Sequence, residues 1–206
     1  NDKRMNKYYL GIDLGSTTSK AVIINETDEI IGRGITNTRA NYKVAADIAR
    51  EEAIYDARFA LLNGKIRKDM IAHPEFTRYM DDIRTVFQYQ QFHRRMESLE
   101  QMLKKTVATF KHANRDDIES KLIKLLENIK PLIRHQFIHE GLGTRNQFFR
   151  DIVSEKYNEE VSKLGTEFFE PLMLAFDKSI TPVENEMVQF NFKELLHESM
   201  NILDEK

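Results

Sequence analysis

The chain has 206 residues, 41% of them hydrophobic and 31% charged, and its formal net charge is −2. This balance is typical of a soluble globular protein that can bury its own core, and it argues against a general attraction to nucleic acid or to an anionic membrane. The complete lack of cysteine excludes disulfides, thiol catalysis and any iron–sulfur cluster held by thiolates of this chain alone.

The hydropathy pattern predicts no membrane-spanning helix, because no apolar run approaches about 18 residues. Residues 1–6 lack the basic and apolar regions of a signal peptide, and we therefore expect a cytoplasmic protein. Residues 1–36 are rich in β-branched residues and hold four of the eight glycines, whereas residues 41–206 have helical periodicity. We expect an α+β fold that is mostly α.

Three short apolar runs near the amino end predict strands. They cover Tyr8–Asp13, Ser19–Asn25 and Glu29–Thr36. Both connections between them are short turns, so the three strands are expected to form a β-meander. A first helix should then span about residues 41–62, with Asn41 as its N-cap and Asn63-Gly64 as its end.

The rest of the chain is predicted to be helical as well. Apolar residues spaced by three and four within 89–110 and 118–137 predict two antiparallel helices. Pro171 is expected at a bend or a helix start, because proline removes a main-chain donor from a helix interior. Further helices are expected at about 145–163, 166–178 and 183–203.

The turn after the first predicted strand carries the most specific chemistry of the sequence. Asp13 ends the strand, and Gly15 follows where a bare backbone is needed. Successive N–H groups and hydroxyls in such a turn can surround phosphate oxygens, and a carboxylate such as Asp13 suits Mg²⁺. Lys20 adds a possible cation, although strand alternation could direct it away. The hydroxyl residues are Ser16, Thr17, Thr18 and Ser19.

Other interpretations of this turn remain open. It could be an ordinary β-turn rich in Ser and Thr, and Lys20 could be a solvated lysine at a strand edge. The common nucleotide loops do not fit, because no G-x-x-x-x-G-K-[ST] is present and the turn leads into a strand rather than a helix.

The residues of this turn carry a family resemblance. Gly11–Thr17 (GIDLGST) resembles the first phosphate motif of the actin-like ATPase superfamily, which includes sugar kinases, chaperone ATPases and actin. Ile12–Ala21 and Ile31–Ala53 resemble, more narrowly, the ATPase subunits of ATP-dependent benzoyl-CoA reductases and the related activators of 2-hydroxyacyl-CoA dehydratases. The resemblance implies the start of a ribonuclease H-like lobe at 1–64 and a helical insertion at 65–206.

The resemblance also implies the cofactors and the partners. ATP and Mg²⁺ would bind at the turn, with Asp13 acting through the water shell of the metal and with phosphate contacts from Gly15, Ser16, Thr17, Thr18 and Lys20. An iron–sulfur cluster would come only from residues outside this chain. The partners would be a sister ATPase subunit, reductase subunits and a ferredoxin-like electron donor, without nucleic acid or membrane. A second phosphate motif and an adenosine-binding Gly-Gly segment are missing, so we expect a fragment or an N-terminal portion.

Alternative functions remain open. The chain could belong to a dehydratase activator or to an actin-like small-molecule kinase. It could instead be a helical protein-docking module, with residues 65–206 binding partners and the β-hairpins only anchoring them.

Several other features have simpler interpretations. The polar segment Thr36–Tyr42 is expected to be a capped strand-to-helix loop, and the resemblance makes it a candidate interface or substrate-side loop. His135 and His139 lie four residues apart on a helix, as zinc ligands would, but no third ligand is evident. Arg94-Arg95 and Lys104-Lys105 are expected on solvated helix faces. Core or subunit-contact positions are expected for Phe148, Phe149, Phe168, Phe169, Met173 and Phe176.

Overall fold

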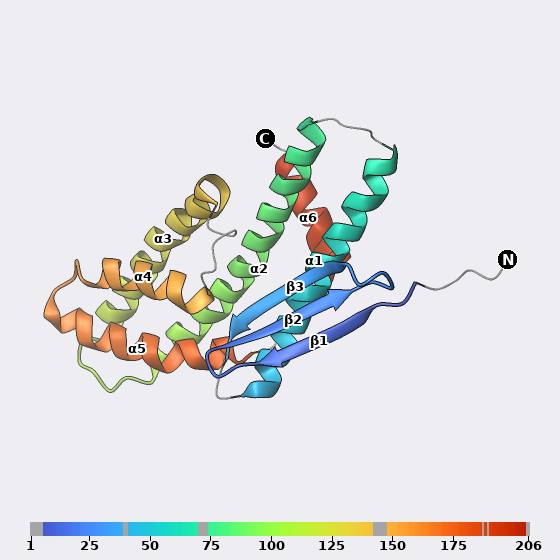
Figure 1. Cartoon of the computed structure of the whole chain (residues 1–206). Helices are drawn as coiled ribbons and strands as arrows, with labels where there is room; N and C mark the ends of the chain where they lie inside the picture. Colours follow the sequence, from blue (N-terminus) through green and yellow to red (C-terminus); the bar gives the residue numbers. More distant parts are fainter. Residues whose placement is uncertain are drawn as a thin grey trace. The chain divides into compact units, whose positions relative to one another are not determined.

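The computed structural model describes residues 6–38, 41–69, 74–141, 148–186, 188 and 190–204. The fold is α+β and mostly helical, with a small antiparallel sheet near the amino end (Figure 1). The chain divides into two compact units, residues 1–81 and residues 82–206, called here the N-terminal unit and the helical unit. The predicted fold class is thus confirmed at this level.

The sheet contains three strands in the order β1-β2-β3, with neighbouring strands antiparallel. They are β1 (Tyr9–Leu14), β2 (Thr18–Ile24) and β3 (Ile30–Asn37). Each begins and ends within two residues of its predicted bounds, and the expected meander is confirmed. Turn chemistry sets these bounds, because short polar connections separate runs that are each long enough for one strand.

Helix α1 (Tyr42–Asp69) lies across one face of this sheet (Figure 1). Asn41 caps the helix as predicted, since its side-chain oxygen accepts hydrogen bonds from the N–H groups of Lys43 and Val44. The strands and the helix approach each other closely. A Cβ on Gly34 would collide with the main-chain oxygen of Ala49 and lie 2.7 Å from the nitrogen of Ala53. Glycine at this position is therefore required by the packing.

The predicted end of the first helix at Asn63-Gly64 is wrong, because α1 continues to Asp69. Gly64 does not have the positive φ of a helix-ending glycine. Its Cβ position is open, with nothing within 4 Å. A glycine costs an exposed helix only about 1 kcal/mol relative to alanine, which the remainder of this long helix outweighs.

The helical unit contains most of α2 (Pro74–Ala108), followed by α3 (Arg115–Glu140), α4 (Phe149–Val161), α5 (Thr166–Glu184) and α6 (Phe192–Asp204). Helices α2 and α3 are antiparallel, as predicted. The rings of Phe92 and Phe137 are 5.0 Å apart, and Glu100 forms an ion pair with Lys130, so residue numbers rise on one helix as they fall on the other.

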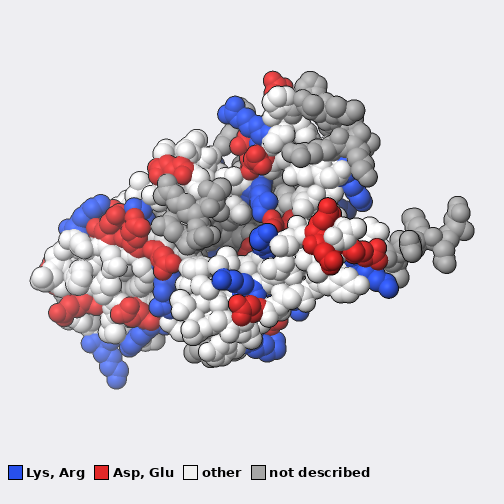
Figure 2. Space-filling view, viewed as in Figure 1, with Lys and Arg blue, Asp and Glu red and all other residues white. Residues whose placement is uncertain are grey.

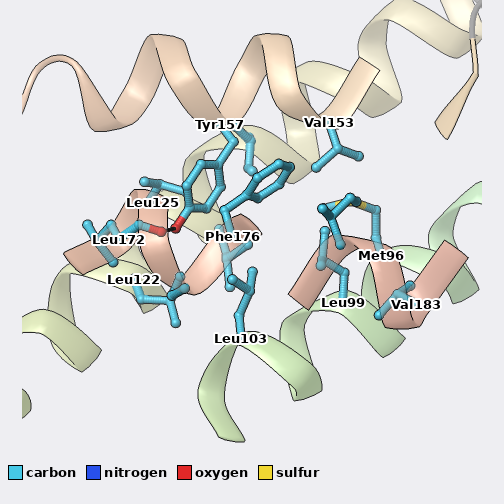
Figure 3. Packing of buried hydrophobic residues seen from close by; sticks show 14 of the residues in the cluster. Met96, Leu99, Leu103, Leu122, Leu125, Val153, Tyr157, Leu172, Phe176 and Val183 are labelled. Carbon is cyan, nitrogen blue, oxygen red and sulfur yellow. Dashed lines mark hydrogen bonds between the residues drawn. The ribbon is translucent and has the colours of Figure 1, made fainter. Parts of the chain in front are cut away.

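One continuous apolar cluster fills the helical unit, with contributions from α2, α3, α4 and α5. Figure 3 shows its centre, where Tyr157 of α4 stacks on Phe176 of α5 at a ring distance of 4.6 Å. The Tyr157 hydroxyl donates a 2.9 Å hydrogen bond to the main-chain oxygen of Leu172. Of the predicted core aromatics, Phe149 and Phe176 are buried, whereas Phe169 is 38% exposed.

The predictions for the carboxyl-terminal helices need three corrections. Pro171 lies inside α5 rather than at its start, and α5 continues to Glu184. The lost main-chain hydrogen bond costs about 3 kcal/mol, which the buried face of α5 offsets. Helix α6 begins at Phe192 instead of near residue 183. Its start is set by Asn191, whose side-chain oxygen accepts from the N–H groups of Lys193 and Glu194.

Charged side chains of both signs are interspersed on the face drawn in Figure 2. Several form ion pairs within the helical unit, including Arg94 with Glu198 at 2.9 Å and Lys104 with Glu100 at 2.6 Å. One member of each predicted basic pair, Arg94 and Lys104, therefore lies half-buried on the helix surface and is paired with an acid. Within the described ranges, none of the helices is both long and apolar enough to cross a membrane.

Candidate phosphate-binding hairpin

The predicted phosphate site lies at the turn between β1 and β2. The Gly15 N–H donates a 3.1 Å hydrogen bond to the main-chain oxygen of Thr18, which closes the turn. A Cβ on Gly15 would lie only 2.7 Å from that oxygen, so the closure requires glycine. Ser16 and Thr17 at the tip are exposed. The sequence thus places a tight, solvent-facing loop directly after the first strand.

Asp13 and Lys20 are brought together by the strand register. They are directly cross-strand partners, so their side chains share one face of the sheet. The neighbouring β2 residues Ser19 and Ala21 are buried on the α1 face, so Asp13 and Lys20 project from the opposite, exposed face. Strand alternation alone allowed the Lys20 side chain to point away from the turn. The register instead puts it on the same side as the carboxylate.

Asp13 is available to a ligand. Among the described residues, its carboxylate forms no hydrogen bond or ion pair. Mg²⁺ keeps most of its waters and takes one or two carboxylates, so a single exposed Asp beside a turn of N–H groups and hydroxyls fits the requirement. Asp13 would hold the metal through its waters, and the turn would hold phosphate oxygens.

The run of hydroxyl residues divides into two groups. Ser16, Thr17 and the half-buried Thr18 lie at the turn, whereas Ser19 is fully buried on the α1 face. The Ser19 hydroxyl lies 3.0 Å from that of Thr38, a residue just beyond β3. The first three hydroxyls are therefore accessible at the turn, whereas the fourth is not.

Thr38 contacts the turn directly, although it was not among the predicted site residues. Its hydroxyl donates a 2.6 Å hydrogen bond to the Gly15 oxygen, and its N–H donates a 2.8 Å bond to the Thr17 oxygen. The sequence indicated a polar segment at Thr36–Tyr42, interpreted as a capped loop or as an interface or substrate-side loop. Its residues 39 and 40 lie outside the described part. The pairing of Thr38 with the turn spans more than twenty residues and has no local sequence signal.

The other candidate ligands lie in the helical unit. The His135 and His139 rings are 4.8 Å apart on α3, as their spacing predicts, and His135 Nδ1 lies 3.3 Å from Glu140 Oε1. In the part of the chain that the structure describes, no group of three or more His, Cys, Asp or Glu could hold a metal. A groove of about 660 Å³ beside this pair is lined by residues that include Tyr89 and Arg134.

The hairpin and the groove differ in what they can hold. The hairpin presents a carboxylate, an amine and a turn on an exposed surface, so the described residues form an open surface there rather than a closed pocket. Comparison with known proteins adds no relative: no family model, no curated protein and no solved structure matches this chain. The hairpin geometry and the sequence resemblance are therefore the observations that bear on function.

Proposed function

We propose that this chain binds the phosphates of ATP–Mg²⁺ at the β1–β2 turn, as the first part of an actin-like ATPase lobe. The supporting observation is the exposed carboxylate of Asp13, which has no partner among the described residues and lies opposite Lys20 at the turn that Gly15 closes. Such a group can orient the waters of a magnesium ion beside the phosphates. Phosphoryl transfer depends mainly on this kind of positioning and charge neutralisation.

The sequence resemblance extends the proposal to a reaction. The chain would be the ATP-hydrolysing subunit, or part of it, of a benzoyl-CoA-reductase-like enzyme. Hydrolysis would then drive a low-potential electron from a ferredoxin-like donor toward the reductase subunits, with a sister ATPase subunit as neighbour. The iron–sulfur cluster would be held by residues outside this chain. The turn's contribution would be to bind and orient the phosphates.

Replacement of Asp13 tests the proposal. In the complete protein, Asp13→Ala should leave the circular dichroism spectrum unchanged, because the side chain is exposed and unpaired among the described residues. It should reduce Mg²⁺-dependent ATP hydrolysis by about two orders of magnitude or more. Glu26→Ala, which removes an exposed acid from the other hairpin turn, is the control and should hydrolyse ATP normally. Undiminished hydrolysis by Asp13→Ala would refute the proposal.

A docking function is the second candidate, and the organisation of the helical unit favours it. Residues 82–206 form a compact unit with a continuous apolar cluster of their own, as a separate docking module would. If the chain acts only in this way, its capture of partner subunits should be the same with and without Mg-ATP and should survive Asp13→Ala. Capture that requires Mg-ATP and is lost in the variant favours the ATPase.

A further inference from the structure

Thr38 forms hydrogen bonds with Gly15, Thr17 and Ser19, and the donor of each bond can be assigned. Its hydroxyl donates a hydrogen bond to the Gly15 carbonyl oxygen, 2.6 Å away. A threonine hydroxyl has only one proton, so the 3.0 Å contact with Ser19 must be a bond in which the Ser19 hydroxyl donates. Because Ser19 is fully buried, water does not compete for this bond. The Thr38 hydroxyl is therefore held in place and pointed at the turn.

These bonds determine which side of the turn presents N–H groups. In a planar trans peptide, the carbonyl and the N–H point in opposite directions, and none of the described peptide bonds is cis. The Gly15 carbonyl shares its peptide with the Ser16 N–H, and the Thr17 carbonyl shares its peptide with the Thr18 N–H. Thr38 binds both carbonyls, through its hydroxyl and its own N–H. Both of these N–H groups are thus directed away from Thr38.

We propose that Thr38 is a positioning residue that presets the turn for an anion. The inference rests on the proposed function, since the anion is the phosphate chain of the nucleotide. Ser16 makes no hydrogen bond with another described residue, so the Gly15–Ser16 peptide is oriented by the Thr38 hydroxyl. Without that hydroxyl, the peptide can rotate and present its carbonyl to the phosphate. A carbonyl repels an anion, whereas an N–H binds it.

A hydroxyl deletion with a matched rescue tests the positioning role. Thr38→Val keeps the β-branched shape and removes the hydroxyl, Thr38→Ser keeps the hydroxyl, and Thr27→Val removes a hydroxyl bonded to Asn25 in the other turn. Hydrogen exchange by NMR, on the full chain without nucleotide, should show protection of the Gly15 and Thr38 amides falling about five- to tenfold in Thr38→Val. Protection should be near wild type in the other two variants. Unchanged protection in Thr38→Val would overturn the inference.

Titration of the complete protein with Mg-ATP separates the two hypotheses. Thr38→Val should raise the Kd for Mg-ATP at least fivefold, and Thr38→Ser should restore it. If the turn loosens in Thr38→Val while the Kd stays the same, the positioning role is wrong and the proposed function stands. If the wild-type protein binds no Mg-ATP, the proposed function and the role of Thr38 toward phosphate are both wrong.

Discussion

The N-terminal unit and the helical unit bury their apolar residues to very different degrees. In the helical unit, four helices surround one continuous cluster and bury side chains such as Leu122 and Tyr157 completely. In the N-terminal unit, β2 and β3 pack on α1, whereas the β1 side chains that share the α1 face are 42% to 46% exposed. These are Leu10, Ile12 and Leu14.

The difference shows what each kind of element needs for burial. Amphipathic helices can complete a core with the next helices along the chain, as α2 to α5 do. An edge strand has unpaired main-chain groups on one side, and its side chains are covered only if another element extends over it. One helix across three strands reaches β2 and β3 fully but does not cover β1. The candidate site lies at the end of this least-buried strand.

The largest effect should come from separating α1 from the sheet. Gly34→Val would push two methyl groups into the main chain of α1 and should destabilise the N-terminal unit by about 3 kcal/mol or more. Hydrogen exchange with mass spectrometry should show lost protection in the N-terminal unit and retained protection in α3 to α5. Gly11→Val is the control, because nothing lies within 4 Å of its Cβ. Equal effects of the two variants would contradict the close packing.

A cavity in the helical cluster should give the next largest effect, in the other unit. Leu122→Ala removes a fully buried side chain and should lower the free energy of unfolding by about 2–3 kcal/mol. Leu132→Ala, on the same helix but 47% exposed, should cost less than about 1 kcal/mol. Urea unfolding followed by circular dichroism measures both. Similar losses of stability in the two variants would mean that α3 does not bury the face that carries Leu122.

A smaller effect is expected from the ion-pair cluster of the helical unit. Burial opposes ionisation of Glu100, but hydrogen bonds from Lys104 and Lys130 outweigh it and lower the pKa of the carboxyl. A carboxyl whose pKa is lowered in the folded state stabilises the fold at pH values above its ordinary pKa. This stabilisation is lost as the pH falls through the pKa of the folded state. Glu100→Gln should therefore cost about 1 kcal/mol at pH 7 and progressively less toward pH 3.

Unfolding curves between pH 3 and pH 7 measure this difference. Glu127→Gln is the control, because Glu127 is exposed on α3 and forms no ion pair with another described residue. Its stability should follow the wild type at every pH. A Glu100→Gln difference that does not change with pH would show that packing, rather than charge, accounts for the loss.

The smallest effect should come from the uncovered strand. Ile12→Thr, at a position 42% exposed, should change stability by less than about 0.5 kcal/mol. Ile23→Thr, on the same sheet face but only 8% exposed, should cost about 2 kcal/mol because it places a hydroxyl against α1. Thermal unfolding of the two variants makes the comparison. A large loss for Ile12→Thr would mean that β1 is covered in solution, for example by a second copy.

Local patterns predicted most of the elements, for identifiable reasons. Alternating runs separated by polar turns located the strands, and apolar spacing of three and four residues located the antiparallel pair α2 and α3. Two of the errors concern residues that disfavour helix interiors. Gly64 was expected to end a helix and Pro171 to lie at a bend or a helix start, yet α1 and α5 continue through them. The cost of each residue is local, whereas the burial that outweighs it is shared along a whole face.

The candidate site likewise has features that the sequence determines and features that only the tertiary structure determines. The sequence by itself determined which residue types occur there, because an acid, a glycine and hydroxyls follow one another at the end of one strand. Only the tertiary structure decided the side on which Asp13 and Lys20 meet, since cross-strand register sets the face of each side chain. It also decided that Thr38 holds the turn and that Gly34 touches α1. Contacts between residues far apart in sequence depend on how strands and helix pack, which no local pattern encodes.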